Sequence, residues 1–79
     1  MLIGITTSGS SKNVLNAIST AKELGVYSVC LTGSKKNGGL AHADAIIGVN
    51  SELTPLIQEA HLVIYHYICA QIELRMLNF

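Results

Sequence analysis

The chain has 79 residues, of which 49% are hydrophobic and only 13% are charged, and its five acidic and five basic side chains balance. Balanced charge offers no electrostatic footprint for a nucleic acid or an anionic membrane surface. The apolar runs fall well short of the ~20 residues that a membrane span needs, and no basic-then-apolar leader is visible, so we expect neither a membrane protein nor a secreted one.

The composition also predicts contacts with other chains. A domain of this size is only marginally able to bury a core, yet the charged fraction is about half the usual ~25%. We therefore expect a homo-oligomer, a dimer or tetramer, with residues 56–76 of the C-terminal helix central to the interface. Cys30 and Cys69 lie in apolar runs, which favours reduced thiols and a cytoplasmic protein.

The first part of the chain predicts a strand, a helix and a second strand. Residues 2–7 form an apolar run that is typical of a strand. Residues 12–24 carry apolar side chains at helical spacing, and Gly25 follows as a stop signal. Residues 26–32 are rich in β-branched and aromatic side chains, which predicts a strand buried on both faces.

A turn-forming stretch, "GSKKNGG", comes before three further elements. Residues 40–44, "LAHAD", predict a short helix, and residues 45–49, "AIIGV", a third strand. From about Leu53 to the end we expect one long helix, with Pro55 in its first turn, where the missing N–H is not needed. The main apolar face of that helix comprises Leu56, Ile57, Ala60, Ile64, Ile68 and Ile72.

Alternating strands and helices predict the fold class. The order β-α-β-α-β-α implies parallel strands joined by right-handed crossovers. We therefore predict an α/β protein with three layers, α/β/α, around a parallel sheet. The sequence contains no internal repeat, low-complexity tract or linker, so residues 1–79 are expected to form one domain.

The bend after the first strand is rich in hydroxyl groups. Residues 6–11, "TTSGSS", hold five Ser or Thr side chains and one glycine between the first strand and the first helix. Ligands of open parallel sheets bind beyond the carboxyl ends of strands, where helix N-termini offer free N–H groups. Gly9 allows a tight turn, and the hydroxyls suit the oxygens of a phosphate monoester. The alternative is that Ser10 or Ser11 only caps the helix.

The same loop departs from the common nucleotide-binding patterns. It has no second spaced glycine, as GxGxxG requires, and no lysine directly after its glycine, as a Walker loop requires. We therefore predict a small phosphate as its ligand, and not a dinucleotide or a nucleoside triphosphate.

Three stretches, "IGITTSGSSKNVLNAISTAKELG", "CLTGSKKNGGLAHADAIIGV" and "TPLIQEAHLVIYHYIC", resemble the C-terminal half of a sugar isomerase (SIS) domain. The most similar type is the phosphoheptose isomerase, which interconverts sedoheptulose 7-phosphate and D-glycero-D-manno-heptose 7-phosphate. The resemblance implies a flavodoxin-like or Rossmann-like SIS fold. In this family the hydroxyl-rich loop holds the sugar phosphate, which implies Thr6, Ser8 and Ser11 as direct donors, with Thr7 close by.

The resemblance also implies a metal, usually zinc, and acid–base chemistry at a Gln and a His of the last helix. These fall on Gln58 and His66. On a helix, eight residues correspond to about 12 Å of rise and ~80° of rotation. Side chains so placed do not comfortably share one ion whose ligands lie ~2 Å away. If both reach one ion, we expect them to come from two chains.

The N-terminal half of the family has no counterpart in this sequence. It carries the first strands of a five-stranded sheet, and a His and a Glu that complete the metal and proton-transfer site. The chain is therefore expected to be a single partial SIS domain, residues 1–79, that is inactive as an isomerase by itself.

The other candidate side chains are expected to be structural. His42 lies in a loop-like segment, which favours the surface. His61 shares a helical face with Ile64 and Ile68, which predicts a hydrogen-bonded histidine in the core or at an interface. Solvated or interface positions are expected for the acidic residues near the last helix, Glu52, Glu59 and Glu73.

Three functions of different classes remain open from the sequence. The first is a sugar-phosphate isomerase, represented here by its C-terminal half. The second is a non-catalytic SIS module that senses a sugar phosphate or binds a protein partner, as relatives that associate with the replication initiator do. The third is an inactive remnant that folds only as an oligomer.

Overall fold

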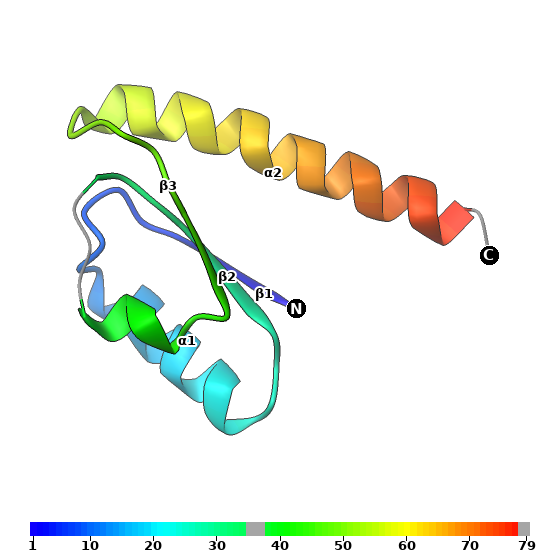
Figure 1. Ribbon diagram of the computed structural model, residues 1–79, viewed down its shortest axis with the longest axis horizontal. Coiled ribbons are helices and arrows are strands. Elements are labelled where there is room, and N and C mark those ends of the chain that lie inside the picture. Colours follow the sequence, from blue (N-terminus) through cyan, green and yellow to red (C-terminus); the bar gives the residue numbers. More distant parts are fainter. Residues whose placement is uncertain (35–37, 78–79) are drawn as a thin grey trace.

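The computed structural model describes residues 1–34 and 38–77 and contains three strands and three helical segments (Figure 1). The expected turn "GSKKNGG" and the end of the last helix therefore lie partly outside the described residues. The elements are β1 (Leu2–Ile5), α1 (Lys12–Glu23), β2 (Ser28–Thr32), the 3₁₀ helix η1 (Gly38–His42), β3 (Ala45–Gly48) and α2 (Thr54–Leu77).

The strands form one parallel sheet in the order β1-β2-β3. Helices α1 and η1 cover one face, and α2 covers the other (Figure 1). The predicted three-layer α/β/α class is confirmed. The core lies between the sheet, α1 and η1, where Ile18, Cys30 and Leu40 are buried together.

Strand β2 begins two residues later than its β-branched run predicts. The cause is the end of α1: the Val26 N–H donates to the Ala21 carbonyl at 2.8 Å and closes the helix instead of joining the sheet. The strand starts where Asp44 can pair with it, because the Asp44 carboxylate accepts from the Ser28 N–H at 2.8 Å. In return, the Asp44 N–H donates to the Ser28 carbonyl at 3.0 Å.

Helix α2 does not bury the whole of its expected apolar face. Of the expected face only Ile57 is buried, while Leu56 is 51% exposed and Ile72 is 45% exposed. Ile72 is exposed because the C-terminal half of the helix extends past the sheet (Figure 1). Leu56 lies in the first turn, next to the buried Ile57, so the buried face is also narrower than expected. Within the part of the chain that the structure describes, no helix combines the length and hydropathy that crossing a membrane requires.

Candidate functional site

The hydroxyl loop, residues 6–11 between β1 and α1, is organised around one buried threonine. Thr6 is only 4% exposed, and its Oγ1 lies 2.9 Å from Ser11 Oγ and 3.5 Å from Ser8 Oγ. The same oxygen accepts the Gly9 N–H at 3.2 Å. Gly9 has a φ of 73°, a left-handed conformation that favours glycine and folds the loop back onto Thr6. The three hydroxyls with implied phosphate roles therefore meet at one point.

The capping alternative does not describe this loop. Ser11 occupies the N-cap position of α1, yet its side chain makes no capping hydrogen bond. Its hydroxyl is paired with Thr6 instead. Ser10 lies one residue before the cap and donates its hydroxyl to Ser8 Oγ at 3.2 Å. Because the first N–H groups of a helix have no partner inside the helix, α1 presents donors next to these hydroxyls.

A cavity of about 210 Å³ opens beside the hydroxyl loop. Its lining combines two residues of that loop, Thr7 and Ser8, with residues of the segment before α2, namely Ser51, Glu52 and Thr54. From the sequence, Glu52 is expected to be solvated or part of an interface, and Ser51 and Thr54 are not expected in the site. A signal was available, because all three follow the carboxyl end of β3, at the same edge of the sheet as the hydroxyl loop.

Backbone contacts around Gly33 hold the two walls of this cavity together. The Ser34 N–H donates to the Ser51 carbonyl at 3.1 Å, and the Val49 N–H donates to the Thr32 carbonyl at 2.9 Å. Gly33 itself is so enclosed that an added Cβ would lie 2.9 Å from the Thr7 carbonyl oxygen and 3.1 Å from that of Ser51. A glycine is therefore required where the two loops meet.

The candidate residues on α2 do not line this cavity. Gln58 and His66 are both exposed, and neither lines it. The His66 ring packs edge-to-face on Tyr65, with centroids 5.0 Å apart. His42 is exposed, as expected, and His61 is buried with its Nε2 3.0 Å from the Thr32 carbonyl oxygen, which confirms a hydrogen-bonded core histidine.

The residues present do not make a complete metal site. Across residues 1–34 and 38–77, no three His, Cys, Asp or Glu side chains are grouped closely enough to hold one ion. Gln58 and His66 could supply two ligands of a zinc ion, whose usual coordination number is about four. The others would have to come from outside the described chain.

The cysteines have no place in the candidate site. Both are free, and Cys30 is buried while Cys69 is exposed. Burial raises the pKa of the Cys30 thiol above its usual value, because a thiolate would be desolvated there. Cys30 is therefore an unreactive core residue.

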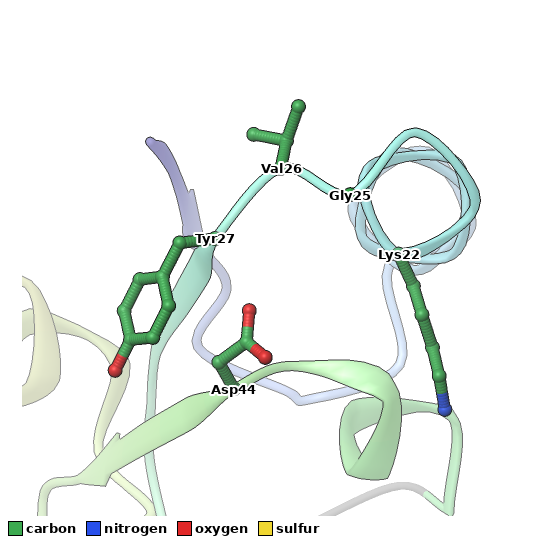
Figure 2. A pocket seen from close by; sticks show the side chains of 5 residues that line it. All are labelled: Lys22, Gly25, Val26, Tyr27 and Asp44. Atoms are coloured by element: carbon green, nitrogen blue, oxygen red, sulfur yellow. The ribbon is translucent and has the colours of Figure 1, made fainter.

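A second cavity, of about 190 Å³, lies at the opposite edge of the sheet and is lined by Lys22, Gly25, Val26, Tyr27 and Asp44. Figure 2 shows Lys22 and Tyr27 on either side of Asp44. The Asp44 carboxylate is already engaged by the Ser28 N–H. Its position is explained by strand pairing, so the hydroxyl-loop cavity is the better candidate for a ligand site.

The chain is similar in sequence to proteins named phosphoheptose isomerase. The chain is 45% identical over 78 residues to the phosphoheptose isomerase of Synechocystis sp., covering 96% of this chain and 39% of that protein. It is 47% identical over 73 residues to the phosphoheptose isomerase of Aneurinibacillus thermoaerophilus, covering 92% of this chain and 37% of that protein. No family model matches the chain.

The chain is also similar to a solved structure of a protein with the same name. Phosphoheptose isomerase GmhA from Neisseria gonorrhoeae superposes with a TM-score of 0.82 at 35% identity, covering 90% of this chain and 41% of that one. The expected resemblance to phosphoheptose isomerases is confirmed over nearly the whole chain. The chain spans about two fifths of the length of the relatives, at 39% and 37% of the two named above.

Proposed function

We propose that this chain is the sugar-phosphate-binding part of a phosphoheptose isomerase, which interconverts sedoheptulose 7-phosphate and D-glycero-D-manno-heptose 7-phosphate. The observation that carries the proposal is the meeting of Thr6, Ser8 and Ser11 at a helix N-terminus, beside a cavity lined by Thr7 and Ser8. A phosphate group has several acceptor oxygens and needs such a set of donors. The similarity to named phosphoheptose isomerases supports the choice of sugar. The two free cysteines support a cytoplasmic location.

The reaction itself requires more than phosphate binding. An aldose–ketose isomerisation moves a proton between neighbouring carbons through an enediol, and needs a base on one face together with polarisation of the carbonyl. In this chain the hydroxyl loop would hold the phosphate and so orient the sugar in the cavity. With no metal ion on its ring, His66 is our candidate for the proton-transfer residue.

The exposure of His66 determines where that transfer would occur. Because His66 and Gln58 lie outside the cavity of their own chain, we propose that they serve a site shared with another chain. Gln58 of one chain and His66 of another would be two ligands of a zinc ion at that shared site, and such an ion, when bound, supplies Lewis-acid polarisation.

We expect the 79-residue chain to show no isomerase turnover by itself, because only one candidate for the acid–base pair is present. Turnover of sedoheptulose 7-phosphate, followed by chromatography with and without added zinc, checks this. If metal-dependent turnover is detected, the expectation is wrong. His66→Ala should then abolish that turnover, while His42→Ala, a change at another exposed histidine, should leave it intact.

Binding tests the proposed function without requiring turnover. By calorimetric titration, the wild-type chain should bind sedoheptulose 7-phosphate but not unphosphorylated sedoheptulose, because only the phosphate engages the hydroxyl loop. The assigned ligand would be refuted if the two sugars bound equally well, or if neither sugar bound.

We also expect the chain to assemble through α2 into a dimer or tetramer. Many large apolar side chains of α2 are exposed, namely Leu56, Leu62, Val63, Tyr67, Ile72, Leu74, Met76 and Leu77. A groove of about 310 Å³ along the C-terminal half of the helix includes Tyr67 and Ile72 in its lining. Covering such a surface removes apolar area from water, which stabilises the assembly by about 25 cal/mol for each Å² buried.

A matched pair of tyrosines tests this assembly. Tyr67 on α2 is 66% exposed, and Tyr27, outside α2, is 55% exposed. In light scattering at micromolar concentration, Tyr67→Ser should shift the wild-type oligomer toward monomer, and Tyr27→Ser should not. A folded wild-type monomer contradicts the proposal, as does an equal effect of the two substitutions.

A further inference from the structure

His61 has the one polar side chain that the described part of α2 buries. It is 1% exposed, and its Nε2 lies 3.0 Å from the Thr32 carbonyl oxygen. A carbonyl oxygen can only accept, so Nε2 carries the proton and donates. The other ring nitrogen, Nδ1, is also buried and has no hydrogen-bond partner among the described residues. The geometry therefore places a proton on Nε2.

The carbonyl that His61 reaches is a junction of three elements. Thr32 ends β2, and its carbonyl oxygen also accepts the Val49 N–H, which follows β3, at 2.9 Å. Ile57 lies one turn before His61 on the same face of α2. Its Cδ1 comes so near Gly33 that an added Cβ would be only 2.6 Å away. One turn of α2 is therefore held against residues 32–33 by a hydrogen bond and by close packing.

The same junction is connected to both walls of the hydroxyl-loop cavity. Toward one wall, the Ser34 N–H donates to the Ser51 carbonyl at 3.1 Å. Toward the other, the Thr7 carbonyl oxygen would lie 2.9 Å from a Cβ at Gly33. Helix α2 itself begins at Thr54, which lines the cavity. A shift of α2 at His61 would therefore change the width of the cavity.

We infer that His61 is a positioning residue: its hydrogen bond to the Thr32 carbonyl sets α2 and the 51–54 segment at the distance from the hydroxyl loop that the sugar portion of the ligand requires. The ligand in this inference rests on the proposed function, but the placement of α2 by His61 does not. His61 does not line the cavity and acts through the segments that do.

Two substitutions separate positioning from stability. His61→Gln can place an amide donor near the position of Nε2, whereas His61→Met fills similar space without a donor. His61→Met should weaken binding of sedoheptulose 7-phosphate by about tenfold, the effect of one hydrogen bond. Its affinity for inorganic phosphate, which needs only the hydroxyl loop, should stay close to that of the wild type. His61→Gln should restore sugar-phosphate binding. Equal affinities per folded molecule in the Met and Gln variants would overturn the inference, because a purely stabilising role predicts that result.

Two NMR measurements keep this inference separable from the proposed function. The ¹⁵N spectrum of the wild-type ring should show the proton on Nε2; a proton on Nδ1 alone would overturn the inference without any variant. The amide signals of Ser8 and Ser51 should shift in His61→Met and return toward wild type in His61→Gln. If the wild type binds no sugar phosphate, the proposed function fails while these shifts still decide the role of His61. Unshifted amides in the Met variant would refute that role.

Discussion

Gly33→Ala should lower the free energy of unfolding by about 2 to 3 kcal/mol, the cost of forcing a methyl group into a packed site. The new Cβ would stand 2.6 Å from Ile57 Cδ1, and that side-chain end can move. It would also stand 2.9 Å from the Thr7 carbonyl oxygen and 3.1 Å from that of Ser51, and these backbone atoms cannot move without displacing the cavity walls. Urea denaturation followed by circular dichroism measures the loss.

Gly38→Ala is the matched control for this substitution. A Cβ at Gly38 meets no heavy atom of the described residues within 4 Å, so its effect on stability should be small. Equal denaturation midpoints for the two variants would show that Gly33 is not enclosed as the structure describes. Sugar-phosphate binding should also weaken in Gly33→Ala, because the displaced carbonyls belong to residues that line the cavity.

The double substitution Ser8→Ala with Ser11→Ala should reduce affinity for sedoheptulose 7-phosphate by about a hundredfold. Each hydrogen bond to a charged phosphate contributes ~1.5 to 3 kcal/mol, so two lost hydroxyls cost about tenfold or more each. Unphosphorylated sedoheptulose, which does not use these donors, should show no binding to the wild type or to the double variant. Calorimetric titration of the folded variant with both sugars gives the comparison.

Ser19→Ala is the control for the double substitution. It also removes a serine hydroxyl, but from a residue of α1 that lies outside the hydroxyl loop. It should leave sugar-phosphate affinity at the wild-type value. Thermal melts of the same proteins separate binding from stability, since the Ser11 hydroxyl pairs with Thr6 and its loss removes that bond as well. Unchanged phosphate affinity in the double variant would reduce the loop to a structural turn.

The amino-acid sequence by itself determined the kind and order of the elements, because strand and helix periodicity are local properties of the chain. The pattern from residue 2 to residue 77 predicts three strands and three helical segments, as observed. The hydroxyl loop was likewise recognisable, since its residues are contiguous. The burial of His61 followed from its helical face. Element ends were less predictable from strand propensity: Gly25, the predicted helix stop, has a φ of 70°, and the Val26 amide after it bonds back to Ala21, which delays the start of β2.

Only the tertiary structure decided which distant segments share the site. Ser51 and Thr54 meet Thr7 and Ser8 because parallel strands bring their carboxyl ends to one edge, although more than forty residues separate them in the sequence. It also decided that the Ser11 hydroxyl turns toward Thr6 instead of capping α1. The apolar pattern of α2 could not show which part is covered. A helix of 24 residues is about 36 Å long, whereas a strand of 5 residues spans only about 17 Å, so about half of the helix extends beyond the sheet that could bury it.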